Sequence, residues 1–396
     1  MREFRIQDNE AGQRFDKYLK KLLSEAPGSF VYKMLRKKNI TLNGKKADGT
    51  EKLAGGDLVR LFLADDTFEK FSGRDKVSAR YESLKSLGEP EGTGSSPKEF
   101  PGDPEASYSA SKCTLSGSED TLNASKNALR CSEGTLSSSK STLRESKAAS
   151  TKKNPRTMHG TYESVLPVLY EDNDILIVNK PSGMLSQKAK PTDLSANEYI
   201  LHYLIEKGEL TEETMQTFMP SICNRLDRNT SGILIAGKTL KGLQETADAL
   251  KERTVLKYYR CIVKGELNEK AYIRGWLTKE ERTNKVTVSK AAPQGKDAQP
   301  IETEYRPVHV KNGYTELEVH LITGRSHQIR AHLSSIGHPI IGDPKYGDQK
   351  VNAYFRRECK ITSQMLHAYR IVLAGQREIV APCGEEFVRV RKMLGF

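Results

Sequence analysis

Residues 224–239, N-R-L-D-R-N-T-S-G-I-L-I-A-G-K-T, carry the pattern that decides the fold of this chain. Asp227 lies between Arg225 and Arg228, whose guanidinium groups favour its ionised form. Residues 229–232 are short and polar and end in glycine, which is typical of a tight turn. The apolar run 233–236 then predicts a short, buried strand. An ionised carboxylate at the entrance to a core strand can serve as a nucleophile or an electrostatic stabiliser, although a structural Arg-Asp-Arg bridge would show the same spacing.

The charge balance of the 396-residue chain indicates the kind of partner to expect. It has 63 Lys and Arg residues against 51 Asp and Glu residues, a formal net charge of +12. Such an excess favours a polyanion such as nucleic acid, with an ordinary basic soluble protein as the alternative. The six cysteines form no C-x-x-C pair, and no apolar run approaches the roughly 20 residues that span a bilayer. We therefore expect a cytoplasmic protein without a disulfide framework, a zinc site or a membrane partner.

Residues 1–71 are predicted to form a small α+β module. Two amphipathic helical patterns are followed by strands at 40–42 and 58–63, with an Asn-Gly hairpin turn between them. The outer side of the second helix carries three cations, Lys33, Arg36 and Lys37. These side chains are candidates for contacts with RNA phosphates, although a solvated basic face would have the same composition.

Residues 72–160 differ in composition, because Ser, Lys, Gly and Glu dominate and large apolar residues are sparse. A 14-residue repeat places Ser-Lys at 111, 125 and 139, and leucine recurs every seven residues from 115 to 143. A coiled coil needs two apolar positions per heptad, and this repeat has one. The segment is therefore predicted to be a disordered linker, with a weak, transient helix as the alternative.

Residues 161–396 are predicted to form one long domain. Strands are expected at 175–178, 255–263 and 317–321, and the second of these places Tyr259 on a buried face, where it could be simply a core aromatic. A helix beginning near Ser326 would carry Arg325 and Arg330 at its N-terminal end. The helix dipole disfavours cations there, so a negative partner is expected, either RNA phosphate or Asp227.

A metal or nucleotide site is not expected. His327 and His332 are five residues apart, whereas a helical metal pair requires a spacing of four. Gly237-Lys238 lacks the spacing of a P-loop. We interpret the two histidines as helix-packing and RNA-contacting groups, and we expect no metal and no small-molecule cofactor.

Several ordered motifs resemble those of one family. The segment 225–232, R-L-D-x-x-T-S-G, is similar to the signature of the RluA-type pseudouridine synthases, in which many members have His where this chain has Asn224. The stretches 179–183 (N-K-P-S-G), 257–259 (K-Y-Y), 321–332 (L-I-T-G-R-S-H-Q-I-R-A-H) and 342–347 (G-D-P-K-Y-G) resemble further motifs of the family. Residues 12–62 resemble an RNA-binding module of a small-subunit ribosomal protein, the S4-like domain, which such synthases often carry.

The resemblance implies an α+β pseudouridine synthase fold with a large mixed, mainly antiparallel sheet, plus the small S4-like module. It implies a monomeric, cofactor-free enzyme that converts uridine to pseudouridine in RNA, with large-subunit ribosomal RNA as the expected substrate. Transfer RNA, or a non-catalytic RNA-binding protein of the same fold, are the alternatives. On the matching positions, Asp227 would act at C1′ or C6, Arg330 would hold it, and Tyr259 would stack on the base. The RNA-binding residues would be Arg225, Arg228, Arg325, His327 and the three cations of the N-terminal module.

Overall fold

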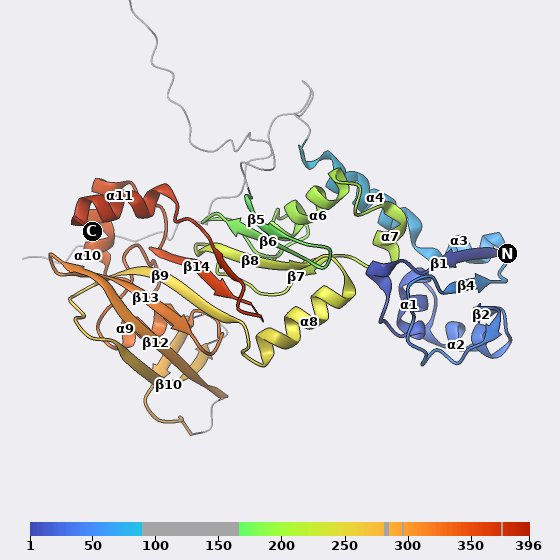
Figure 1. Ribbon diagram of the computed structural model, residues 1–396, viewed down its shortest axis with the longest axis horizontal. Helices are drawn as coiled ribbons and strands as arrows, with labels where there is room; N and C mark the ends of the chain where they lie inside the picture. The colour runs from blue at the N-terminus through green and yellow to red at the C-terminus, as the bar shows by residue number, and fades with distance from the viewer. Residues whose placement is uncertain (89–165, 281–284, 295–296, 374) are drawn as a thin grey trace, which may run out of the picture. The chain divides into compact units, whose positions relative to one another are not determined.

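The computed structural model describes residues 1–88, 166–280, 285–294, 297–373 and 375–396 (Figure 1). The leucine repeat of the predicted linker lies outside these residues. None of the helices in the described part of the chain has the length and apolar character that a membrane crossing requires.

The N-terminal module is built from two helices on a small antiparallel sheet. Its elements are β1 (Arg2–Arg5), the 3-10 helix η1 (Asp8–Glu10), α1 (Phe15–Leu22), α2 (Gly28–Arg36), β2 (Ile40–Leu42), β3 (Lys45–Lys46) and β4 (Leu58–Leu61). The strand order is β1-β4-β2-β3. The apolar faces of α1 and α2 bury Phe15, Leu19, Val31 and Leu35 in a core of its own, which explains why their periodicity was readable in the sequence.

The segment after this module begins differently from the prediction. Residues expected to start a linker at 72 instead continue as helix, in α3 (Asp65–Ser72), α4 (Arg74–Lys85) and η2 (Ser86–Gly88). Most of α4 is polar, and Leu84 is its buried residue. Leu84 belongs to the main hydrophobic core, which gives this polar helix a packing partner that its composition does not reveal.

One large sheet organises the remainder of the chain. Its strands are β5 (Val168–Glu171), β6 (Ile175–Lys180), β7 (Ser221–Ile222), β8 (Ser231–Gly237), β9 (Leu256–Lys264), β10 (Ala271–Glu280), β11 (Lys285–Ser289), β12 (Ala298–Lys311), β13 (Tyr314–Leu321), β14 (Leu366–Val372) and β15 (Glu378–Val380). The order is β11-β10-β12-β13-β9-β14-β8-β6-β5, with β15 on β14 and β7 on β8. Among the described strands only β8 and β14 pair in parallel. The predicted mixed, mainly antiparallel sheet is confirmed.

Helices cover the sheet on both faces. They are α6 (Ala196–Glu206), α7 (Glu212–Thr217), α8 (Leu240–Lys251), α9 (Gln328–Ser335), α10 (Gln349–Cys359) and α11 (Glu385–Leu394). Alternate residues of β8 point to opposite sides: Leu234 lies in the core that includes α6, and Ile233 and Ile235 lie in the core that includes part of α8. Figure 1 shows α6 and α8 on either side of these strands. A strand buried on both faces reads as the continuous apolar run seen at 233–236.

Candidate active site

The loop between β7 and β8 carries Asp227, and backbone hydrogen bonds fix its shape. The amide of Thr230 donates to the carbonyl of Asp227 at 3.0 Å, which closes the predicted turn. The buried hydroxyl of Ser186 donates to the carbonyl of Leu226 at 2.9 Å and accepts from the Leu226 amide at 3.0 Å. The loop is therefore held on both sides of Asp227, whose side chain remains 28% exposed.

Gly232 allows β8 to approach β14 just after this loop. Its φ is +113°, and a Cβ atom at this position would lie 2.2 Å from the carbonyl oxygen of Ala368. A side chain is therefore excluded both by the backbone conformation and by the neighbouring strand. This close approach is the reason for the glycine that ends the predicted turn.

Asn224, where many family members have His, binds the backbone of β8. Its Nδ2 donates to the carbonyl of Ile233 at 3.3 Å, and its Oδ1 accepts from the amide of Ile235 at 2.8 Å. The side chain thus bridges a donor and an acceptor of the strand, which an amide can do because it carries both groups at one end. Asn224 therefore stabilises β8, the strand that follows the Asp227 loop.

Arg330 joins two carboxylates. Its Nη1 donates to Oδ2 of Asp227 at 2.8 Å, while Nε and Nη2 make a bidentate pair with Asp343 at 2.7 and 2.9 Å. Arg330 is 5% exposed and Asp343 is fully buried. Burial acts to lower the pKa of Arg330, but its hydrogen bonds to the carboxylates of Asp343 and Asp227, together with their negative charges, outweigh this effect, so the pKa is raised and the guanidinium stays charged. The negative partner expected for Arg330 is therefore Asp227 together with Asp343.

Asp343 anchors this arrangement in turn. Burial acts to raise its pKa, but the Arg330 pair and the amides of Lys345 and Tyr346 hold it below the usual range. The side chain of Asp343 accepts from these amides at 2.8 and 3.1 Å. The sequence analysis did not predict that Asp343 pairs with Arg330, although its position in the G-D-P-K-Y-G motif marked it as a candidate.

Tyr259 lies on β9 on a buried face, as predicted. It is 8% exposed and belongs to the main core. Burial raises its pKa, and the nearby Asp227 carboxylate acts in the same direction. The phenol is therefore neutral at ordinary pH.

The other predicted residues of this domain take different positions around Asp227. Arg225, Arg228 and Arg325 are exposed. Arg228 donates from Nε to the carbonyl of Gly183 at 3.2 Å, and the ion pair of Asp227 is with Arg330. The structural Arg-Asp-Arg bridge considered from the spacing is therefore not found in the described part of the chain.

His327 precedes α9 in a left-handed conformation with φ of 55°. Because such a residue interrupts the helical backbone, α9 begins at Gln328, two residues later than predicted. Burial lowers the pKa of His327, whereas the Asp227 carboxylate acts to raise it. Nδ1 of His327 lies 3.0 Å from the Tyr346 hydroxyl, and Nδ1 of His332 lies 3.0 Å from Thr303, so the two imidazoles have different partners. No group of three or more His, Cys, Asp or Glu side chains suited to a metal ion occurs among the residues described.

Lys180, which sequence reasoning did not single out, lies beneath the Asp227 loop. It is fully buried, and its Nζ donates to the carbonyls of Pro181, Met184 and Arg228 at 2.8, 2.8 and 3.1 Å. Burial lowers the pKa of Lys180 to about 7, and the Asp227 carboxylate acts in the opposite direction. The available signal was a lysine between a strand and a turn in the N-K-P-S-G stretch.

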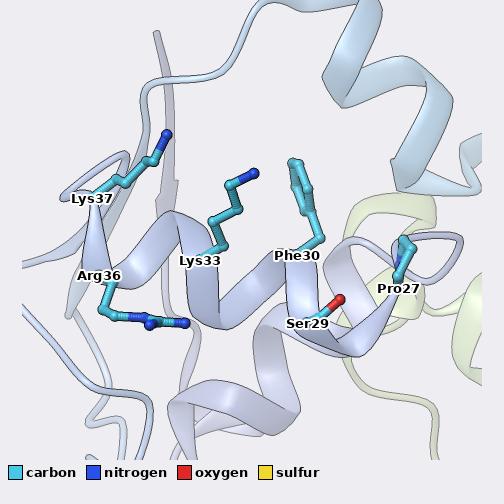
Figure 2. Close-up of a pocket in the computed structure, with 6 residues that line it drawn as sticks. All are labelled: Pro27, Ser29, Phe30, Lys33, Arg36 and Lys37. Carbon is cyan, nitrogen blue, oxygen red and sulfur yellow. The ribbon is translucent and has the colours of Figure 1, made fainter.

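The cations predicted on the N-terminal module line a groove on α2. Pro27, Ser29, Phe30, Lys33, Arg36 and Lys37 enclose about 600 Å³. Figure 2 shows Lys33, Lys37 and Phe30 extending from the same side of the helix. The three cations are exposed, as a phosphate-contacting surface requires.

Comparison with known proteins finds similarity to one family. Residues 174–335 match the model described as RNA pseudouridylate synthase. The chain is 28% identical over 395 residues to the ribosomal large subunit pseudouridine synthase C of Vibrio vulnificus (strain CMCP6), covering 98% of this chain and 95% of that protein. It is 33% identical over 186 residues to the ribosomal large subunit pseudouridine synthase D of Yersinia pestis, covering 47% and 54% respectively. Among solved structures, human RNA pseudouridylate synthase domain containing 4 aligns at 21% identity with a TM-score of 0.48, covering 58% of this chain and 92% of that one. The matches to the family model and to the curated synthases support an RluA-type RNA pseudouridine synthase.

Proposed function

We propose that the chain isomerises specific uridines of large-subunit ribosomal RNA to pseudouridine and that Asp227 acts on the target nucleotide. The names of the relatives support the substrate, and transfer RNA is the alternative. The observation that carries the assignment of Asp227 is its pair with Arg330, in which a buried, charged guanidinium at 2.8 Å holds a carboxylate that is still 28% exposed.

In this reaction uracil is detached from C1′ and reattached through C5, so no group donor and no net redox step is needed. Of the two carboxylate oxygens of Asp227, only Oδ2 accepts a hydrogen bond from a side chain of the described residues. The other oxygen, Oδ1, is therefore available to act on the RNA. An ionised carboxylate oxygen can attack C1′ or C6, or stabilise positive charge at C1′. Arg330 would keep Asp227 oriented, because Asp343 fixes the remainder of the Arg330 guanidinium.

We assign Tyr259 the role of stacking on the target base. Its raised pKa favours a neutral phenol, which can stack and donate a hydrogen bond more readily than it can remove a proton. A contribution of Tyr259 to proton removal at C5 would therefore require a further group to accept the phenolic proton.

RNA binding would involve the exposed cations. A uridine within a structured RNA must leave its stack to reach Asp227, so the protein must hold the flanking backbone. Arg225, Arg228 and Arg325 are exposed on the loops next to Asp227 and Arg330, and His327 precedes α9. Lys33, Arg36 and Lys37 would add phosphate contacts from the N-terminal module.

The decisive test is Asp227→Asn. The amide keeps the shape of the side chain but loses its charge and nucleophilicity, so we expect no detectable isomerisation in single-turnover assays at saturating RNA. RNA affinity should change by less than about threefold, because Asp227 supplies no phosphate contact. Asp248→Asn on the exposed side of α8 is the matched control and should be fully active. Turnover of Asp227→Asn within tenfold of the unsubstituted enzyme would refute this role.

The substrate is tested separately. Pseudouridines are mapped in ribosomal and transfer RNA from cells with and without this gene. Loss of sites in large-subunit ribosomal RNA supports the proposal, whereas loss confined to transfer RNA would favour the alternative. An unchanged map in both RNA classes would favour a non-catalytic RNA-binding protein.

A further inference from the structure

Tyr346 lies in the loop after α9, where it contacts the groups that support Asp227. The centre of the Arg330 guanidinium is 5.2 Å from the centroid of the Tyr346 ring. The ring of His327 meets it edge-on at a centroid distance of 5.8 Å and an angle of 69°. The backbone of Tyr346 is fixed as well, since its amide donates to Asp343 at 3.1 Å and its carbonyl accepts from Ser334 at 3.0 Å.

The hydroxyl of Tyr346 connects two segments that are distant in the sequence. It accepts a hydrogen bond from the backbone amide of Val286 at 2.9 Å and lies 3.0 Å from Nδ1 of His327. Because a phenol has a single proton, a hydroxyl that accepts from Val286 can donate that proton to His327. This requires an unprotonated Nδ1, which agrees with the lowering of the His327 pKa by burial.

The amide of Val286 belongs to β11, the edge strand of the large sheet. Val286 also belongs to a small core with Leu277, Ile301 and Ala331, and the ring of Tyr346 packs against this core. An edge strand has unpaired backbone groups, and the Tyr346 hydroxyl satisfies one of them. The Val286–Tyr346–His327 chain of hydrogen bonds therefore connects the sheet edge to the residue that immediately precedes α9.

His327 needs such support because of its backbone. A non-glycine residue with φ of 55° is strained and persists only where its surroundings hold it. Arg330 follows in the first turn of α9, so a change in the conformation of His327 would move the guanidinium that pairs with Asp227.

We propose that Tyr346 is a positioning residue for the reaction. Its hydroxyl links His327 to edge strand β11 and its ring packs on Arg330, so that the Arg330 guanidinium stays within hydrogen-bonding distance of Asp227. This inference rests on the proposed role of the Asp227–Arg330 pair. It assigns Tyr346 no contact with the substrate.

The hydrogen-bond chain has a consequence for the pH dependence. The charged groups that act on His327 are Asp227 and Asp343, which favour its protonation, and Arg330 and Lys345, which oppose it. When Nδ1 of His327 is protonated, it can no longer accept the hydroxyl proton of Tyr346. Its own hydrogen would point at the Tyr346 hydroxyl, which already accepts a hydrogen bond from the amide of Val286. The rate of the unsubstituted enzyme should therefore fall at acid pH as His327 gains a proton.

The test is Tyr346→Phe, which keeps the ring on Arg330 and removes only the hydroxyl. We expect the single-turnover rate at saturating RNA to fall by about tenfold, which corresponds to one hydrogen bond of roughly 1.4 kcal/mol. RNA affinity should be unchanged. The decrease in rate at acid pH that comes from protonation of His327 should no longer be seen in this variant. His327→Asn, which tolerates the left-handed backbone, should show little further loss when Tyr346→Phe is added. Tyr354→Phe, at an exposed tyrosine of α10, is the matched control and should behave as the unsubstituted enzyme.

The outcomes separate this inference from the proposed function. If Tyr346→Phe keeps the full rate and pH profile while Asp227→Asn is inactive, the positioning role is refuted and the proposed function stands. If the effects of Tyr346→Phe and His327→Asn are additive, the hydroxyl does not act through His327 and the inference fails. If Asp227→Asn is itself active, the proposed function fails first.

Discussion

At the scale of single residues, Lys180 combines complete burial with three carbonyl acceptors, and no carboxylate of the described residues forms an ion pair with it. Its three N–H donors match the carbonyls of Pro181, Met184 and Arg228, and the last of these immediately follows Asp227. These three hydrogen bonds need the protonated ammonium group, whereas burial disfavours its charge and lowers the pKa of Lys180 to about 7. The residue thus stabilises the Asp227 loop at the cost of a buried charge.

This conflict predicts a pH-dependent stability. A lysine in the unfolded chain has a pKa of about 10.4. Between pH 7 and 10 the unfolded chain therefore binds more protons at this position than the folded one, so the free energy of unfolding rises with pH, by at most about 1.4 kcal/mol per pH unit. Below pH 7 both states are protonated and the dependence vanishes. Denaturant unfolding of the unsubstituted protein and of Lys180→Met from pH 6 to 9 should show this difference growing above pH 7.

The control is Lys251→Met at an exposed position of α8, whose stability should remain parallel to that of the unsubstituted protein. A difference between the unsubstituted protein and Lys180→Met that stays constant from pH 6 to 9 would mean that the carbonyls keep Lys180 charged. Its pKa would then not be lowered.

At the scale of elements, the parallel contact between β8 and β14 depends on Gly232. Gly232→Ala would place a Cβ atom 2.2 Å from the Ala368 carbonyl oxygen in addition to straining φ. We expect a loss of more than about 3 kcal/mol in the free energy of unfolding, because backbone strain and a clash with backbone add together. The single-turnover rate should also fall, because the strand begins four residues after Asp227.

Gly313→Ala separates the two contributions. Gly313 has a φ of +77°, and nothing lies within 4 Å of the Cβ that would be added there. Strain alone should cost about 1–2 kcal/mol, with full activity. Equal losses of stability in the two variants, measured by denaturant unfolding, would show that β8 and β14 can separate without cost.

The strands that could be predicted from the sequence are those whose apolar pattern comes directly from burial of a face of the strand. β8, β9 and β13 are apolar on a buried face and are bounded by turns, so periodicity located them. β12 was not predicted, since Pro300 and Pro307 argue against a strand, and the structure places a register shift at Pro307. The ion pair between Asp227 and Arg330 was anticipated from the motifs, but the bidentate pair with Asp343 depends on tertiary contacts that spacing alone does not encode.

At the scale of the whole molecule, a compact N-terminal α+β module precedes the large sheet, and three exposed cations line the groove on its helix α2. All three residues with a proposed catalytic role come from the large sheet and its connections. Chemistry and RNA affinity should therefore respond to different substitutions. Composition did not predict the helical continuation through α3 and α4, because a polar helix with a single buried residue resembles a linker in sequence.

The final prediction separates affinity from chemistry by the dependence of binding on salt. Replacement of Lys33, Arg36 and Lys37 by Gln removes up to three phosphate contacts, so the slope of log affinity against log salt should become shallower by about 2, at roughly 0.7 per contact with single-stranded RNA. The single-turnover rate at saturating RNA should remain unchanged, because these side chains do not belong to the site around Asp227. A control with the same change in net charge replaces the exposed Lys251, Lys270 and Lys392 by Gln and should keep the original slope. Equal slopes for both triple variants would mean that the α2 groove does not bind RNA, whereas a lower saturated rate in the α2 variant alone would mean that the N-terminal module also positions the target uridine.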